Sequence, residues 1–266
     1  MEKLYGTPLV SIIMAAYNSE KTIELAIRSV QSQTFDKWEL IVVNDCATDR
    51  TPEIVASLQK NDVRIKLINN KVNSGVSISR KNGLKLASGK WIAVLDSDDM
   101  WVREKLEKQL AFADKTGGEF FFTGSSFIDA EGNSIDWQLH VPETLSYRKL
   151  LKQNLISNSS VLINADLYKK YYAVGDKMHE DFAMWLSITR EGYTAYGIDE
   201  PLLIYRLSNS SKSSNKIKAA LMNWNTYRYI GLPLPEASYY MICYTVNGIR
   251  KYKKIRNADS ANAVKR

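Results

Sequence analysis

Cysteine is scarce in this chain of 266 residues, where only Cys46 and Cys243 occur. Neither cysteine stands in a metal-ligand spacing, and two cysteines are too few for a disulfide framework. The chain also lacks any apolar run of about 18 residues, which excludes a membrane-spanning helix. Its first residues lack the basic region and the cleavage site of a secretory signal. We therefore expect a cytoplasmic protein without structural disulfides.

An excess of positive charge is absent from most of the chain. The sequence holds 36 basic and 29 acidic residues, a formal net charge of +7. Seven of the basic residues and one acid lie between 248 and 266, which leaves 29 basic and 28 acidic residues elsewhere. A nucleic-acid-binding groove needs a concentrated basic surface. We therefore expect no nucleic acid partner, and the basic character belongs to the C-terminal end.

The first half of the chain alternates apolar runs of strand length with amphipathic stretches of helix length. The predicted strands are 9–17, 39–45, 65–70 and 91–96, and the predicted helices begin near 18, 51, 75 and 102. Asn18 or Ser19 is expected to cap the first helix, while Gly89 and Gly117 are expected to end the third and the fourth. This alternation predicts an α/β fold with a mixed, mostly parallel sheet flanked by helices.

The pattern loosens after about residue 119. The segment 119–135 is predicted to hold a strand and then a turn at 131–133. Further strands are predicted at 159–163, 193–198 and 202–207, and a helix of about three turns at 179–192. From residue 216 onward the chain becomes helical and aromatic. We therefore expect one domain over residues 1–215, followed by a helical, basic C-terminal extension over residues 216–266.

The segment WIAVLDSDDMW, residues 91–101, ends an apolar run with Asp96, Asp98 and Asp99. Asp45 ends the second predicted strand in the same way. Open parallel sheets bind ligands at the carboxyl ends of their strands, so these acids are expected to meet in one crevice. Close carboxylates resist burial unless a cation compensates, and their oxygens suit Mg²⁺ or Mn²⁺. Taken alone, the same residues fit a solvated turn that caps the next helix equally well.

Five segments of the chain follow one another in a characteristic order. They are VSIIMAAYN, VVNDCATDRT, NSGVSISRKNG, WIAVLDSDD and HEDFAMWL. In this order they resemble glycosyltransferase family 2, over about residues 7–215. The resemblance implies the Rossmann-like GT-A fold for residues 1–215 and an inverting transferase that uses a nucleotide-sugar donor. Uracil is the usual base in this family, so the implied donor is a UDP-sugar and the implied cofactor Mn²⁺ or Mg²⁺.

The resemblance also implies roles for individual residues. The donor would be bound by Ala15, Tyr17, Asn18, Asp45, Arg80, Asp96 and Ser97. Asp98 would be the direct metal ligand, and Asp181 the catalytic base. Glu180 and Trp185 would contact the acceptor, although packing in the core explains Trp185 as well as a stacked sugar does.

These residue types suit the implied reaction. Departure of a nucleoside diphosphate from the anomeric carbon develops negative charge, which a divalent cation and a basic side chain stabilise. The attacking sugar hydroxyl is a poor nucleophile and needs a general base on the opposite face. Asp98 and Asp181 supply the metal site and the base. A single base without a second carboxylate nucleophile fits one displacement, with inversion at the anomeric carbon.

Several positions depart from the family pattern. Ala15 replaces a common proline, Asn44 a common aspartate and Cys46 a common glycine. Ser208 stands where many members of the family carry a histidine near the metal, so a third protein ligand is not predicted. Lys212 is either a diphosphate contact or a solvated loop residue.

The C-terminal extension has a pattern of its own. Residues 239–255 alternate aromatic and aliphatic residues with Arg250, Lys251, Lys253 and Lys254. A basic amphipathic helix of this kind binds anionic membrane surfaces. The alternative is a helix that packs on the domain and leaves its basic end in solvent. Because lipid-linked acceptors are common in the family, we expect peripheral contact with the cytoplasmic face of the membrane.

The expected function is therefore transfer of one or a few sugars to a hydroxyl of a glycan or lipid-linked acceptor in surface polysaccharide biosynthesis. The chain lacks the transmembrane helices and the Q/RxxRW motif of the processive synthases of the family. One alternative is a nucleotidyltransferase, although no glycine-rich phosphate loop with a lysine occurs near the N-terminus. The other is a non-catalytic module that binds nucleotides or sugars, against which the retained aspartates argue.

Overall fold

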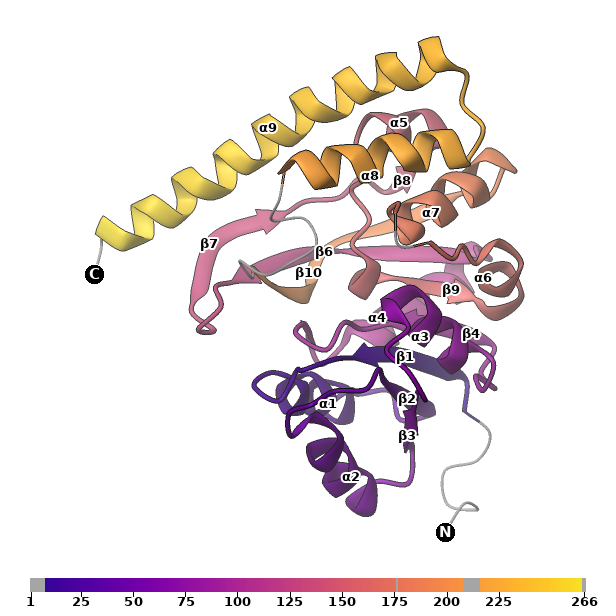
Figure 1. Ribbon diagram of the computed structural model, residues 1–266, viewed down its shortest axis with the longest axis vertical. Helices are drawn as coiled ribbons and strands as arrows, with labels where there is room; N and C mark the ends of the chain where they lie inside the picture. The colour runs from indigo at the N-terminus through magenta and orange to yellow at the C-terminus, as the bar shows by residue number, and fades with distance from the viewer. Residues whose placement is uncertain (1–7, 176, 208–215, 265–266) are drawn as a thin grey trace.

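Ten strands form one mixed sheet in the part of the chain that the structure describes (Figure 1). The structure is a computed structural model and describes residues 8–175, 177–207 and 216–264. The order across the sheet is β3-β2-β1-β4-β9-β6-β10-β5, with β7 paired to β6 and β8 to β10. The strands are β1 (Val10–Ala16), β2 (Trp38–Asn44), β3 (Ile65–Asn69), β4 (Trp91–Val94), β5 (Met100–Trp101), β6 (Phe120–Ile128), β7 (Ser134–Leu139), β8 (Thr144–Leu145), β9 (Leu162–Asn164) and β10 (Ala195–Arg206).

Helices cover both faces of this sheet. They are α1 (Ile23–Gln31), α2 (Thr51–Asn61), α3 (Gly75–Leu84), α4 (Lys105–Thr116), α5 (Tyr147–Lys152), α6 (Ala165–Tyr171), α7 (Glu180–Arg190), α8 (Lys216–Tyr229) and α9 (Leu234–Val264), with a 3₁₀ turn at Asn158–Ser160. Side chains alternate between the faces along each strand. Ile12 and Met14 of β1 pack with α1, α2 and α4, whereas Ile13 packs in the core that holds α6 and α7. The predicted α/β fold is therefore confirmed.

The direction of the strands brings several strand ends to one edge. β1 pairs in parallel with β2 and β4, and β2 pairs in parallel with β3. β9 is antiparallel to both β4 and β6, so β6 and its parallel neighbour β10 run in the same direction as β4. The residues that follow β1, β2 and β4 therefore lie at the same edge as Arg206, the last residue of β10. This edge is where an open parallel sheet binds its ligands.

Two predicted helix bounds were wrong. α1 begins at Ile23, after the cap residue Thr22, rather than at Asn18 or Ser19. The reason is that Ser19 N–H donates to Thr51 Oγ1 at 2.8 Å, which holds this segment as a loop. α3 ends at Leu84, well before Gly89.

Gly89 serves close packing instead of ending a helix. Its N–H donates to Ser11 Oγ at 2.8 Å, and a Cβ at this position would lie 2.7 Å from Ser11 N. Gly117 does end α4, with a positive φ of 65°. The two strands predicted at 193–198 and 202–207 are one irregular strand, β10.

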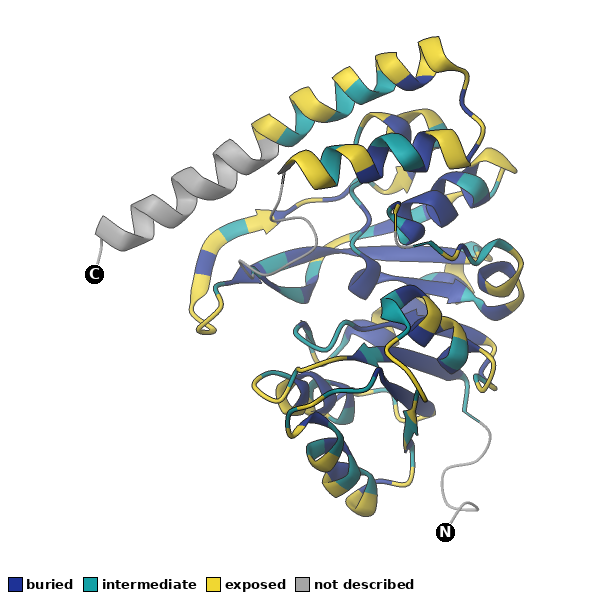
Figure 2. Ribbon diagram, viewed as in Figure 1, coloured by how far each residue is buried: buried dark blue, intermediate teal, exposed yellow. Residues whose placement is uncertain are grey.

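The first part of the C-terminal extension shares its core with the preceding domain. Tyr227 of α8 is fully buried, and its hydroxyl donates to Leu151 O at 2.6 Å. Ala237 of α9 is also fully buried. Figure 2 shows that the other residues of α9 whose burial is described are exposed or of intermediate burial. Across the residues described, no helix combines the length and the apolar character that crossing a membrane requires.

Candidate active site

The DSDD segment forms a tight turn directly after β4. Asp99 N–H donates to Asp96 O at 3.1 Å, which closes the turn. Asp96 N–H donates to Ser159 Oγ at 3.1 Å, so the turn is also tied to the 3₁₀ turn before β9. The carboxylates of this segment thus start from a fixed backbone at the ligand-binding edge of the sheet.

Arg80 of α3 connects this turn to the start of α7. Only 8% of its side chain is exposed. The guanidinium donates to Asp96 Oδ1 and, at 3.1 Å, to Glu180 Oε1. Burial alone would lower the pKa of Arg80, but Asp96 and Glu180 outweigh burial and raise the pKa above its ordinary value. A permanent positive charge therefore lies between the two acidic motifs.

Asp98 and Asp99 experience an unfavourable concentration of negative charge. Burial and the neighbouring Asp96 raise the pKa of Asp98 to about 6. Arg206 and Arg80 oppose this shift without cancelling it. Asp99 is 1% exposed, and burial together with its two acidic neighbours raises its pKa well above the usual range. A cation bound at this turn would relieve the repulsion.

The donor atoms of this turn fit a hard divalent cation. Carboxylate oxygens are the ligands that Mg²⁺ and Mn²⁺ prefer, and Asp98 is only partly buried. No three His, Cys, Asp or Glu side chains form a ready metal site within residues 8–175, 177–207 and 216–264. Asp98 would thus need phosphate or water oxygens to complete the coordination. Ser208 and Lys212, considered above for this site, lie outside the described residues.

Arg206, which was not among the residues expected at this site, holds the other side of the turn. Its N–H donates to Asp99 Oδ1 and its Nε to Asp98 O, both at 3.0 Å. Its Nη1 donates to Asp129 O at 3.3 Å and to Ala130 O at 3.2 Å, which joins the turn to the end of β6. Its position in the sequence could have indicated this role, because a basic residue that ends a parallel strand lies at the ligand-binding edge of the sheet.

Asp45, expected to contact the base of the donor, lies just beyond β2 and is 3% exposed. Its Oδ1 accepts hydrogen bonds from Asn70 Nδ2 at 2.8 Å and from Ser74 N–H at 2.9 Å. Its Oδ2 accepts from Gly75 N–H at 2.8 Å. Burial alone would raise the pKa of Asp45, but the bonds from Asn70 and the two N–H groups hold it below its ordinary value. Asp45 is therefore an ionised anchor for the start of α3, and its base contact stays a prediction.

The remaining expected donor residues belong to β1 or follow β1 and β4: Ala15, Tyr17, Asn18 and Ser97. Tyr17 is 51% exposed and available to a ligand. Asn18 has a φ of 49°, and its Oδ1 accepts from Thr48 N–H at 2.8 Å. Ser19 Oγ and Ser97 Oγ share a hydrogen bond at 2.8 Å, which ties the two strand ends together.

Asp181, the expected base, is the second residue of α7. Its Oδ1 accepts from the Phe182 N–H at 2.7 Å. It lines a narrow hollow, too small to hold a water molecule, together with Arg80, Asn158, Tyr168, Tyr172, Ala173, Glu180 and Met184. The structure thus brings Asp181 into the same hollow as Arg80, which itself binds Asp96.

The acceptor role expected for Trp185 is wrong. Trp185 is fully buried, with an exposed fraction of 0%, so its ring is not accessible to an acceptor. Its ring packs against Phe120 with centroids 4.9 Å apart. Glu180 is also largely enclosed, with 10% of its side chain exposed, and it pairs with Arg80. Core packing accounts for Trp185, and the ion pair with Arg80 accounts for the position of Glu180.

Comparison with known proteins identifies relatives along nearly the whole chain. Residues 11–168 match the family model "Glycosyl transferase family 2". The chain is 40% identical to TuaG of Bacillus subtilis, a glycosyltransferase assigned to teichuronic acid biosynthesis, over 92% of this chain and 97% of TuaG. It is 38% identical to WfgD of Escherichia coli, named as a UDP-Glc:α-D-GlcNAc-diphosphoundecaprenol β-1,3-glucosyltransferase, over 92% and 95% of the two chains.

Solved structures of low sequence identity have the same fold. Staphylococcus aureus TarS in complex with UDP-GlcNAc superposes with a TM-score of 0.69 at 20% identity, over 87% of this chain and 70% of TarS. The mannosyltransferase PcManGT of Pyrobaculum calidifontis, solved with GDP-Man and Mn²⁺, gives 0.67 at 16% identity, over 89% and 69%. The matches to the family model and to the two named glycosyltransferases decide against a nucleotidyltransferase and against a non-catalytic module. The chain belongs to glycosyltransferase family 2 and is a glycosyltransferase with the GT-A fold.

Proposed function

We propose that this glycosyltransferase moves a sugar from a UDP-sugar to a hydroxyl of a glycan or lipid-linked acceptor, with a divalent metal and with inversion. The position of Arg80 carries the proposal. Arg80 binds Asp96 at the DSDD turn and lines the hollow that contains Asp181. One place in the fold therefore offers acids for a cation, a fixed positive charge and a partly exposed carboxylate.

The nucleotide is proposed to bind where β1 and β2 end. Tyr17 is exposed there, and Asp45 fixes the loop that leads into α3. The E. coli relative is named for UDP-Glc, and TarS was solved with UDP-GlcNAc, whereas PcManGT was solved with GDP-Man. The relative at 38% identity carries more weight than a mannosyltransferase at 16% identity. This comparison favours uracil.

The diphosphate is proposed to lie between Asp98 and Arg80. Asp98, with Asp96 beside it, would hold Mn²⁺ or Mg²⁺. When bound, the cation adds positive charge against the leaving diphosphate. Arg80 remains charged because of its two carboxylate partners, and it would stabilise the charge that develops on the leaving phosphate. Arg206 keeps the DSDD turn in position for both tasks.

Asp181 is proposed to accept the proton of the acceptor hydroxyl during attack. The bond from Phe182 N–H orients its Oδ1 and leaves Oδ2 for the acceptor. Because a general base activates the hydroxyl directly, no covalent sugar–enzyme intermediate is needed, and the anomeric carbon inverts. Glu180 is proposed to position Arg80 rather than to touch the acceptor.

The acceptor is proposed to belong to surface polysaccharide biosynthesis at the cytoplasmic face of a membrane. The names of TuaG and WfgD support this class, since one is assigned to teichuronic acid and the other to an undecaprenol-linked sugar. On α9, an exposed stripe supports peripheral membrane contact; it consists of Ile242, Val246 and Ile249. The spacing of three and four residues places these side chains on one side of the helix. The sequence that follows, 250–256, is strongly basic, which suits an anionic surface.

Release of nucleotide from a panel of nucleotide sugars tests the proposal. The expected result is slow release of UDP from one donor with Mn²⁺ or Mg²⁺, which EDTA abolishes. Asp98→Ala should lose this release, while Asp136→Ala, at an exposed position of β7, should keep it. Calorimetry of UDP with and without Mn²⁺ covers the case in which release requires the acceptor. Absence of any metal-dependent UDP binding would contradict the UDP-sugar assignment.

A further inference from the structure

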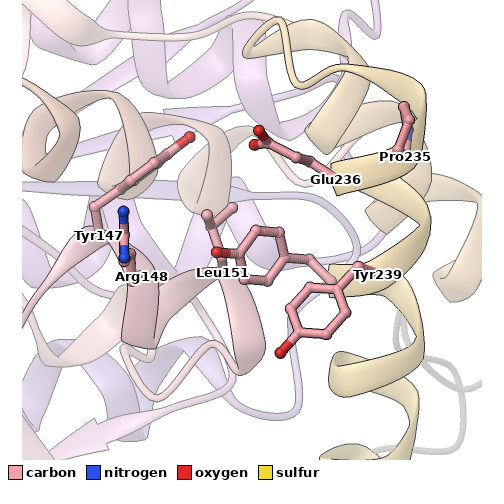
Figure 3. A pocket seen from close by; sticks show the side chains of 7 residues that line it. Tyr147, Arg148, Leu151, Pro235, Glu236 and Tyr239 are labelled. Atoms are coloured by element: carbon pink, nitrogen blue, oxygen red, sulfur yellow. The ribbon is translucent and has the colours of Figure 1, made fainter.

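A second pocket, of about 620 Å³, lies between α5 and the start of α9 (Figure 3). It is lined by Tyr147, Arg148, Leu151, Pro235, Glu236, Tyr239 and Tyr240. Its volume falls within the range of about 300–1,000 Å³ that is typical of small-molecule sites. None of these side chains belongs to the candidate active site.

The length of α7 separates this pocket from the catalytic carboxylate. Asp181 lies in the first turn of α7, and Arg190 is its last residue. At about 1.5 Å per residue, the helix between them spans about 14 Å. The Arg190 guanidinium lies next to Tyr147 of the pocket. The pocket shares no lining residue with the hollow that contains Asp181, so a ligand bound here contacts a separate set of side chains.

Aromatic rings form one side of the pocket. The rings of Tyr239 and Tyr240 meet edge to face, with centroids 5.1 Å apart and an angle of 70° between their planes. Tyr239 is 54% exposed, so a ring face is available to a ligand. Tyr147 closes the opposite side of the pocket. Burial raises the pKa of its hydroxyl and Arg190 lowers it, while Glu236 and Tyr240 raise it further. These groups therefore surround one space, as Figure 3 shows for Tyr147 and Glu236.

Two charged side chains of opposite sign give the pocket its selectivity. Arg148 and Glu236 make no hydrogen bond or ion pair with any described part of the chain. Their charges offset one another, and the carboxylate disfavours a phosphate or another anion. A guanidinium only donates hydrogen bonds and a carboxylate only accepts them, whereas hydroxyl groups do both. Aromatic faces with one donor group and one acceptor group match a neutral ring that carries hydroxyls.

We propose that this pocket is an accessory sugar site, which holds a neutral pyranose residue of the glycan away from the residue that reacts. The apolar face of the pyranose would stack on Tyr239 or Tyr240, and its hydroxyls would bond Arg148 and Glu236. Such a second contact raises the effective concentration of the acceptor at the active site. This role rests on the proposed glycan acceptor, whereas the binding itself is measurable without any transfer reaction.

Nuclear magnetic resonance of protein labelled with ¹³C in the tyrosine rings tests the proposal. The probes are glucose, galactose and N-acetylglucosamine, each at about 100 mM, well above a millimolar Kd. At least one sugar should shift the signals of Tyr147, Tyr239 and Tyr240 saturably, with assignment from Tyr147→Phe, Tyr239→Phe and Tyr240→Phe. Arg148→Ala and Glu236→Gln should each weaken this binding about tenfold, because each removes charge-assisted hydrogen bonds. Ser238→Ala, an exposed neighbour outside the pocket, should leave the binding unchanged.

Three outcomes would overturn the proposal. The first is that none of the three sugars shifts these signals. The second is that inorganic phosphate shifts them and the sugars do not, which would make the pocket an anion site. The third is that the shifts persist in both Arg148→Ala and Glu236→Gln. The same titration of Asp181→Asn separates this proposal from the proposed reaction, because the variant should bind sugar in the pocket whether or not Asp181 is the base.

Discussion

Arg80 donates a hydrogen bond to Glu180 across 100 residues of chain. The other half of the same guanidinium binds Asp96, so the DSDD turn after β4 and the start of α7 are fixed relative to each other. The pair lies in a largely enclosed place, with 8% of the Arg80 side chain and 10% of the Glu180 side chain exposed. Arg80 therefore links the DSDD turn directly to the start of α7, where the proposed base Asp181 lies.

Replacement of Arg80 should cost both stability and activity. Arg80→Met removes the guanidinium that pairs with the buried carboxylate of Glu180, and breaking a buried pair costs about 3–5 kcal/mol of unfolding free energy. Arg80→Lys should be intermediate, because an ammonium cannot reproduce both contacts of the fork. Urea unfolding measures the loss, and Arg28→Met is the control, since Arg28 pairs with the exposed Glu24 within α1 and should cost under about 0.5 kcal/mol. Equal stability of Arg80→Met and the wild type would contradict this role.

Asp181→Asn should abolish most transfer while leaving the fold intact. An amide cannot accept the proton of the acceptor hydroxyl, and a positioned general base contributes about 10²–10⁴-fold to the rate. Metal-dependent UDP binding should be unchanged, because the donor side of the site is untouched. The measurement is kcat for transfer beside the Kd for UDP, with Asp166→Asn at the exposed start of α6 as control. Transfer by Asp181→Asn at the wild-type rate would refute the assignment.

Asp98→Asn should stabilise the metal-free protein near neutral pH. The pKa of Asp98 is about 6 in the fold and about 3.9 in an unfolded chain. A raised folded pKa gives stability that is present below the unfolded pKa and is lost as the pH rises through 6. The variant should therefore melt at a higher Tm than the wild type at pH 7.5 in EDTA, with the difference shrinking toward pH 4. Added Mn²⁺ should raise the Tm of the wild type only.

A lower Tm for Asp98→Asn than for the wild type at pH 7.5 in EDTA would contradict the electrostatic account.

The pKa of Asp98 also predicts how binding of the metal should depend on pH. Below about pH 6 a proton competes with the metal for Asp98. Metal-dependent UDP binding should therefore weaken as the pH falls from 7.5 to 5.

Glu39 should contribute to stability in a pH-dependent way. Its buried carboxylate accepts from Ser11 Oγ at 2.6 Å, Lys66 Nζ at 2.6 Å and Ser88 N–H at 2.8 Å. Burial alone would raise its pKa, but Lys66 and the two serines outweigh burial and lower it. A lowered folded pKa stabilises the fold above the unfolded value of about 4.3, and this stability is lost as the pH falls through the folded pKa.

Glu39→Gln should therefore cost about 1–3 kcal/mol of unfolding free energy at pH 7. The cost should begin to shrink as the pH falls below about 4.3, where the unfolded chain takes up a proton, and should be smallest below the lowered pKa of the folded carboxyl. Urea unfolding at both pH values checks the prediction. Glu131→Gln, in an exposed turn before β7, is the control and should show neither effect. A cost that does not change with pH would point to packing rather than to charge.

The apolar stripe of α9 should be required for membrane binding. Cosedimentation with vesicles of phosphatidylcholine, with and without phosphatidylglycerol, measures it, and binding is expected only to the anionic vesicles. Ile242→Glu and Ile249→Glu should each weaken binding at least fivefold, because both positions are more than 60% exposed and would enter the interface. Thr245→Ser, at an exposed position between them, should bind normally. Equal binding to both vesicle types, or to none, would contradict the proposal.

Elements defined by long apolar runs could be predicted from the sequence. Every residue of β2 is buried, as is every residue of β4, and such strands leave an unmistakable pattern. The acids that follow them lie at one edge of the sheet, because parallel strands align their carboxyl ends. The expectation that these acids meet in one crevice stays a prediction. Short elements such as β5 and α5 were missed, since two to six residues are too few for a periodic signal.

Contacts between distant segments could not be predicted in the same way. Nearly every residue of α7 from Phe182 to Thr189 is buried, so the sequence gives no polar side from which to orient Trp185. Arg206 was missed because its partners are carbonyl oxygens, Asp98 O among them, and backbone atoms leave no trace in the sequence. The pairing of Arg80 with Glu180 likewise depends on how α3 and α7 meet in the folded protein.

The loops that follow β1 and β2 are joined before any donor arrives. Asn18 holds Thr48, Ser19 binds both Thr51 and Ser97, and Glu20 N–H donates to Asp49 Oδ2 at 3.0 Å. The nucleotide end of the site is therefore preorganised. Little conformational entropy should be lost when a donor binds, so its affinity reflects the contacts themselves rather than the ordering of the protein.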